Sequence, residues 1–79
     1  MDQEINEVII QYLREHYQTR DDIGDHPITT EDIISELSGA GFGHLNIYDA
    51  NRYLKRVGFF GVTIPGDADM IWKIKAHKI

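Results

Sequence analysis

The chain has 79 residues, enough for one domain, and it contains no cysteine, so disulfides and cysteine-ligated zinc are excluded. Its composition, 42 % hydrophobic and 27 % charged, is typical of a soluble globular domain and not of a disordered segment. The net charge of −5 argues at first against nucleic acid, but the charges are unevenly distributed. Residues 1–44 hold ten carboxylates against two arginines, whereas residues 45–79 hold six basic residues against three carboxylates. Such a chain can present a basic face although its total charge is negative.

The first predicted element is an amphipathic helix. Its apolar residues recur at helical spacing: Ile5, Val8, Ile9, Tyr12 and Leu13. Asp2 is the expected N-cap, and Glu4 suits the positive end of the helix dipole. Residues 18–25 are polar and predict a loop, and Pro27–Ile28 can form a short strand.

The second predicted helix has a complete start signal. Thr29 is the expected N-cap, and Asp32 stands three residues later, where it can close a capping box. Ile28 and Ile33 occupy the positions of a hydrophobic staple. The helix should end in residues 38–43, where three glycines make continuation costly. This glycine-rich stretch lacks the Lys-Ser/Thr ending of a phosphate-binding loop, so we interpret it as a turn.

The third predicted helix covers residues 46–57, with Asn46 as its N-cap and Gly58 just after its end. One face is apolar and should face the core: Ile47, Ala50, Leu54 and Val57. The intervening residues should face outward and are basic, amide-bearing or aromatic: Tyr48, Asn51, Arg52, Tyr53, Lys55 and Arg56.

After Gly58 the apolar period changes from 3.6 to 2, which predicts a β-hairpin over residues 60–76 around a Pro65–Gly66 turn. In its first strand Phe60, Val62 and Ile64 alternate with small or polar residues. In its second strand Trp72 and Ile74 should face the core, with Lys73 and Lys75 facing water. The predicted core draws on all the elements: Ile9, Leu13, Ile34, Leu37, Leu54, Val57, Val62, Trp72 and Ile74.

This order of elements resembles the winged helix-turn-helix fold. The run from Tyr53 to Phe59, followed by a hairpin that ends in Ile71-Trp72-Lys73-Ile74, is similar to winged-helix modules of transcription regulators and of phage and mobile-element primase-helicases. The resemblance implies an α+β fold in which residues 1–79 form one domain, a three-helix bundle with a C-terminal hairpin wing. It also implies double-stranded DNA as partner, with residues 46–57 as recognition helix and 60–76 as wing.

The resemblance also implies which residues bind nucleic acid. They are Tyr48, Asn51, Arg52, Lys55 and Arg56 on the helix, and Thr63, Lys73 and Lys75 on the wing. Arginine and lysine suit guanine, asparagine suits adenine, and wing lysines suit phosphates. Asp67 and Asp69 at the wing tip depart from the pattern, as does the long glycine-rich connection before the third helix. With so few cations, homodimerisation would supply further affinity.

A second hypothesis is a protein-interaction adaptor or inhibitor, such as a phage or mobile-element protein occupying the nucleic-acid site of another protein. It would use an acidic face around Glu4, Glu7 and Glu15. No nucleophile, metal-ligand or cofactor pattern is present, because the histidines are scattered, so we expect no enzyme activity, cofactor or metal. The sequence holds neither a long apolar run nor a signal peptide, so we expect a cytoplasmic protein away from membranes.

Overall fold

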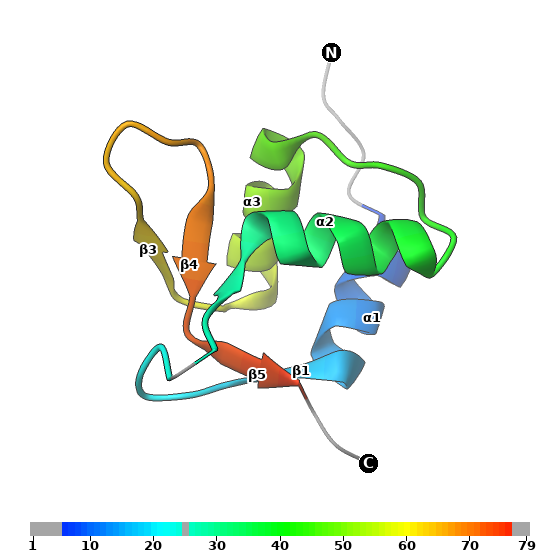
Figure 1. Ribbon diagram of the computed structural model, residues 1–79. Coiled ribbons are helices and arrows are strands. Elements are labelled where there is room, and N and C mark those ends of the chain that lie inside the picture. Colours follow the sequence, from blue (N-terminus) through cyan, green and yellow to red (C-terminus); the bar gives the residue numbers. More distant parts are fainter. Residues whose placement is uncertain (1–5, 25, 77–79) are drawn as a thin grey trace.

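The computed structural model describes residues 6–24 and 26–76, which form three helices and two small antiparallel sheets (Figure 1). The helices are α1 (Glu7–His16), α2 (Thr30–Gly39) and α3 (Ile47–Val57). The fold class predicted from the sequence is confirmed at this level: three helices, with an antiparallel hairpin following the third. None of the described helices combines the length and apolar character needed to cross a membrane.

Local side-chain caps define where the helices begin. Thr29 Oγ1 accepts a hydrogen bond from the Asp32 amide at 3.3 Å, and Asp32 Oδ2 accepts one from the Thr29 amide at 3.0 Å, so the predicted capping box is confirmed. Asn46 caps α3 by accepting from the Tyr48 amide at 2.8 Å, also as predicted. The N-cap of α1 is Asn6; the cap predicted for this helix, Asp2, lies outside the described residues, as does Glu4.

The first sheet has the strand order β2-β4-β3, with β2 (Ile28–Thr29) and β3 (Gly61–Thr63) on either side of β4 (Met70–Trp72). All pairs are antiparallel, and Trp72 lies opposite Ile28 on one side and Gly61 on the other. The short strand before α2 is therefore confirmed, and the predicted hairpin is confirmed over residues 61–72, whereas residues 74–76, predicted as the end of its second strand, belong to the other sheet. In Figure 1 this sheet lies beside the first turns of α2.

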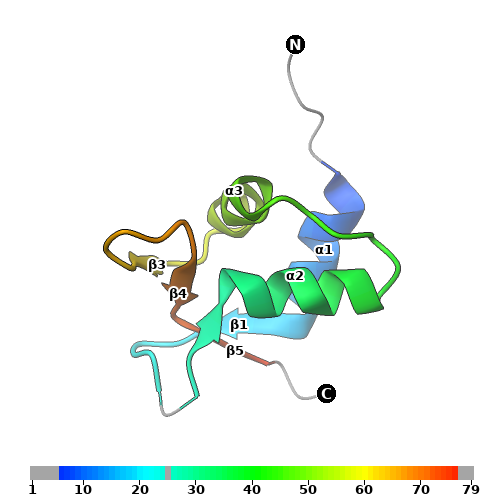
Figure 2. The same ribbon diagram turned by 45° about the horizontal axis from the view of Figure 1, so that its top comes forward.

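The second sheet was not predicted. It pairs β1 (Tyr17–Thr19) with β5 (Ile74–Ala76), so the polar segment expected as a loop begins with a strand. The two sheets meet at Lys73, whose amide donates to the Phe60 carbonyl and whose carbonyl accepts from the Arg20 amide, both at 2.9 Å. Figure 2 shows α3 and the β1–β5 sheet on opposite sides of α2.

The core lies between the three helices and β4. Seven of the nine predicted core residues are buried: Ile9, Leu13, Ile34, Leu37, Leu54, Trp72 and Ile74. Val57 is only half-buried, and the prediction for Val62 is wrong, because its side chain is 38 % exposed on the edge strand β3.

The turn after α3 explains this error. Gly58 adopts a φ of 107°, its amide donates to the Lys55 carbonyl, and the Phe59 amide donates to the Leu54 carbonyl. This is the Schellman arrangement, in which the residue after the glycine packs back on the helix. Phe59 is accordingly buried and Phe60 is exposed, so β3 turns Gly61 rather than Val62 towards Met70 and Trp72, and all three of its residues are exposed.

Candidate nucleic-acid interface

The outward face of α3 presents one aromatic and three cationic side chains. Tyr48, Arg52 and Lys55 follow one another at helical spacing, Arg56 lies beside them, and all four are exposed. Ala50 and Leu54 on the opposite face are fully buried. Four of the five predicted recognition-helix contacts are therefore brought together on one accessible face.

The charge of this face is partly offset within the helix. Arg52 Nη2 lies 3.9 Å from Asp49 Oδ1 one turn earlier, and the Arg52 side chain remains 57 % exposed. An ion pair this long and exposed is weak.

Asn51 differs from the outward position that the helical spacing predicts. It is half-buried, its Nδ2 donates to the Ala68 carbonyl at 2.9 Å, and its Oδ1 accepts from the Thr30 hydroxyl. Both ends of the amide thus hold the fold together. Reading an adenine would require both hydrogen bonds to break, and a buried polar group left unpaired is costly.

The predicted wing residues do not share one surface. Thr63 is exposed on β3, within the hairpin. Lys73 is half-buried at the corner between the sheets, and Lys75 lies on β5, opposite Gln18 of the second sheet. The expectation that both lysines belong to the wing is therefore corrected: the chain leaves the first sheet at Lys73.

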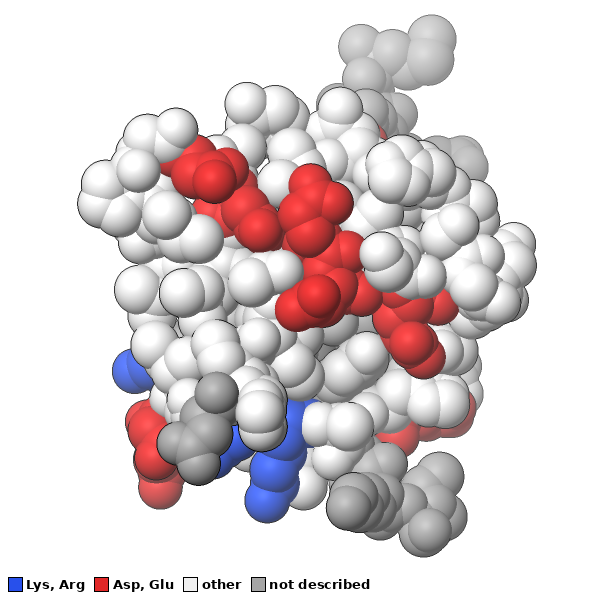
Figure 3. All heavy atoms as spheres, in the orientation of Figure 1, with Lys and Arg blue, Asp and Glu red and all other residues white. Residues whose placement is uncertain are grey.

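The hairpin loop and α2 together carry a band of acidic side chains. Figure 3 shows carboxylates running from the hairpin loop across α2, while the basic side chains visible in that view lie towards the β1–β5 sheet. The acidic residues of these two segments define the band: Glu31, Asp32, Glu36, Asp67 and Asp69. Asp69 Oδ1 accepts from the Glu31 amide at 3.2 Å and the Met70 amide at 2.9 Å, which fastens the loop to the first turn of α2.

The acidic residues predicted on the first helix are more dispersed. Glu7 is in the first turn of α1 and Glu15 in its last, so eight residues, or about 12 Å of helix, separate them. Glu15 also accepts a hydrogen bond from Gln11. The sequence contained a signal for the band, because Glu31, Asp32 and Glu36 fall on the polar side of the second predicted helix.

Comparison with known proteins returned nothing: no protein-family model, curated protein or solved structure matches the chain. Among the described residues, no group of three or more histidines and carboxylates is placed to hold a metal ion. Any function must therefore be argued from the geometry of the described surfaces.

Proposed function

We propose that the protein is a winged helix-turn-helix module that binds duplex DNA through the outward face of α3. The element order supports this fold, since a short strand precedes α2, the hairpin follows α3, and the sheet order is β2-β4-β3. In this interpretation α2 and α3 form the helix-turn-helix, with an unusually long turn over residues 40–46. A recognition helix lies in the major groove and presents its exposed side chains to base edges.

The observation that carries the proposal is the convergence of three cations and a tyrosine on the one exposed face of α3. Arg52 and Lys55 occupy the middle of that face and are the candidates for guanine contacts. Arg56 and Tyr48 at its two ends suit phosphate or sugar contacts, and Thr63 is the remaining candidate from the hairpin. Asn51 is not among the proposed DNA contacts because its amide is hydrogen-bonded within the fold. Lys73 and Lys75 are not among them because they lie at the β4–β5 corner and on β5.

The acidic band limits the strength of this binding. It covers the first turn of α2 and the hairpin loop, two places where winged-helix modules approach phosphates. The contact must therefore centre on α3, with about three phosphates neutralised. The affinity should then fall with salt with a logarithmic slope of about −3.

The test is a fluorescence anisotropy titration with mixed-sequence duplex at low salt. Replacing Arg52 or Lys55 with alanine should each weaken binding by roughly 1–3 kcal/mol. Arg14→Ala, an equal charge change on an exposed position of α1, is the control and should have little effect. Absence of binding at about 100 μM protein, the weak end of the non-specific range, would contradict the proposal.

A second candidate function follows from the acidic band itself. A continuous carboxylate surface complements a basic partner protein, and the same fold can serve as an adaptor. In that case the band, rather than the α3 face, makes the contact. Alanine at Arg52 or Lys55 would then leave partner binding unchanged, whereas charge reversal at Glu31 and Asp67 would abolish it.

A further inference from the structure

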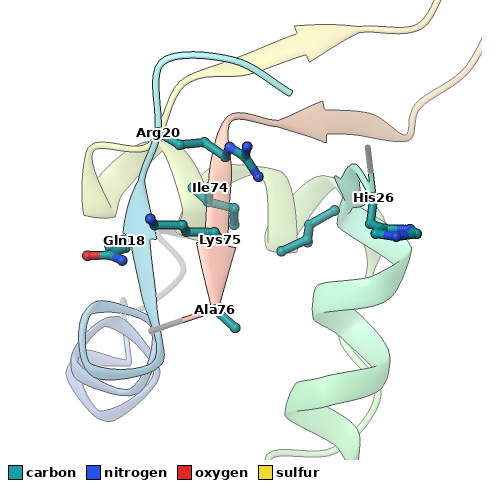
Figure 4. A pocket seen from close by; sticks show the side chains of 7 residues that line it. Gln18, Arg20, His26, Ile74, Lys75 and Ala76 are labelled. Atoms are coloured by element: carbon teal, nitrogen blue, oxygen red, sulfur yellow. The ribbon is translucent and has the colours of Figure 1, made fainter. Parts of the chain in front are cut away.

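A hollow of about 590 Å³ lies between the β1–β5 sheet and β2 (Figure 4). Its lining comes from three separate segments of the chain: Gln18, Arg20, His26, Ile28, Ile74, Lys75 and Ala76. The volume is in the range of small-molecule sites. Because the β1–β5 sheet and α3 lie on opposite sides of α2, this hollow is separate from the proposed DNA interface (Figure 2).

The lining combines an apolar floor with a cationic rim. Ile28, Ile74 and Ala76 are apolar, and of these Ile28 and Ala76 are accessible, whereas Ile74 is only 1 % exposed. Gln18, Arg20, His26 and Lys75 are all potential hydrogen-bond donors. None of the described residues that line the hollow is a carboxylate, although the chain has 13 acidic residues against 8 basic ones. The hollow therefore favours an anion within an acidic protein.

Arg20 is fixed in place before any ligand arrives. Its Nε and Nη2 donate to Asp22 Oδ1 at 3.1 and 3.0 Å, and its backbone amide donates to the Lys73 carbonyl. The guanidinium also packs against Gly24, where an added Cβ would lie 2.4 Å from Nη1. Holding the guanidinium in this way reduces the entropy that binding would otherwise cost. Asp22 is 76 % exposed, so the ion pair is weak and leaves attraction for a ligand anion.

Figure 4 shows how these groups surround the hollow. Arg20 extends from the end of β1 towards β5, Lys75 extends from β5 over β1, and His26 lies on the other side of β5. Donors that approach from several directions suit a group with three acceptor oxygens better than a carboxylate with two. The apolar floor suits a flat, weakly polar body attached to that group.

We propose that this hollow binds a nucleoside monophosphate, with the phosphate at Arg20 and Lys75 and the base against Ile28 and Ala76. The site is independent of DNA binding by α3, so either proposal can fail without the other.

The test is a titration of the ¹⁵N-labelled full chain, followed by amide chemical shifts, with adenosine monophosphate, adenosine and inorganic phosphate. Adenosine monophosphate should shift the amide signals of residues 18–20, 26, 28 and 74–76 with a dissociation constant on the order of 1 mM. Phosphate should bind more weakly at the same residues, and adenosine should have almost no effect. Shifts scattered over the surface, or none at about 10 mM nucleotide, would overturn the proposal.

Charge variants test whether Arg20 and Lys75 themselves bind the nucleotide. Lys75→Ala and Arg20→Ala should each weaken nucleotide binding about tenfold, whereas Asp22→Asn should strengthen it up to about fivefold by removing a negative charge that competes with the ligand anion. Lys55→Ala is the matched control, because it removes the same charge from α3 and should reduce duplex binding only. If Lys55→Ala weakens nucleotide binding as much as Lys75→Ala, the attraction is not local and the proposal is wrong. Lys75 is exposed on its strand, so this variant should fold even if Arg20→Ala does not.

Discussion

Thr30 is a fully buried polar side chain that joins four parts of the molecule. Its hydroxyl accepts a hydrogen bond from Trp72 Nε1 at 2.8 Å and donates one to Asn51 Oδ1, while Asn51 Nδ2 donates to the Ala68 carbonyl. The chain of hydrogen bonds therefore runs from β4 through α2 and α3 to the hairpin loop. Since each buried polar atom in it has a partner, the network fixes how the hairpin sits against the helices.

Replacing Thr30 with valine keeps the shape of the side chain and removes the hydroxyl. The indole N–H of Trp72 and the amide of Asn51 then lose a partner inside the core, which should lower the free energy of unfolding by about 1–3 kcal/mol. Thr63→Val, the same change on exposed β3, should alter it by less than about 0.5 kcal/mol. Urea denaturation measures both, and hydrogen exchange of the indole N–H in this single-tryptophan chain reports the network directly. Equal stability of the two variants would show that the hydroxyl contributes nothing.

Tyr17 makes stability sensitive to alkaline pH. Burial, reinforced by the negative charge of Glu36, raises the pKa of the Tyr17 phenol from 10.0 to about 12. A phenol whose pKa is raised on folding stabilises the native state below pH 10, and this contribution is lost as the pH rises from 10 to 12. Tyr17→Phe cannot ionise, so its denaturation midpoint should fall less over that interval than that of the parent. Tyr48→Phe, at an exposed position, should follow the parent, and identical curves for all three proteins would refute this role of Tyr17.

Asn51 illustrates what residue spacing can and cannot predict. Its position on the third helix was predicted correctly, but its side chain turns away from the exposed face that carries Arg52 and Lys55. Its burial depends on Thr30, which is 21 residues away, and on the loop carbonyl of Ala68. Polar pairing between elements leaves no periodic signal in a sequence, so an asparagine that completes a core network resembles one that faces water.

At the scale of elements, the helices were the most predictable feature because their signals are local. The caps at Thr29 and Asn46 lie within three residues of the groups that they satisfy, and Gly58 ends α3 through its own φ. The pairing of β1 with β5 joins residues more than fifty positions apart and depends on the chain turning at Lys73. The three residues of β1 carry no recognisable alternation, and the alternation that includes β5 assigned it to the hairpin, so the second sheet was not predicted.

At the scale of the whole molecule, segregation of charge along the chain did not translate into one basic face. The described basic residues of the second half divide between α3 and the segment from the end of β4 to β5. The carboxylates of the first half that lie together are those of α2. The hairpin loop, which belongs to the second half, adds its own carboxylates to the same band. Of the candidate nucleic-acid contacts, the exposed α3 residues were therefore predictable from helical spacing, whereas the two lysines depended on a chain path that spacing does not reveal.

The acidic band provides the sharpest comparison between the two candidate functions. Glu31→Gln with Asp67→Asn removes two negative charges beside α3 and the hairpin, while Glu7→Gln with Glu15→Gln removes the same charge from α1. If α3 enters a groove, the band charges repel the flanking phosphates. The first pair should then strengthen duplex binding by roughly 0.5–1 kcal/mol at low salt and clearly more than the second pair.

If the band itself binds a basic partner, the first pair should instead weaken binding of an arginine-rich probe peptide, and duplex binding should be absent in the parent as well. Anisotropy titrations of the three proteins against duplex and peptide, at two salt concentrations, distinguish these outcomes. Equal gains for both pairs would mean that only net charge matters, and would remove the support for docking centred on α3.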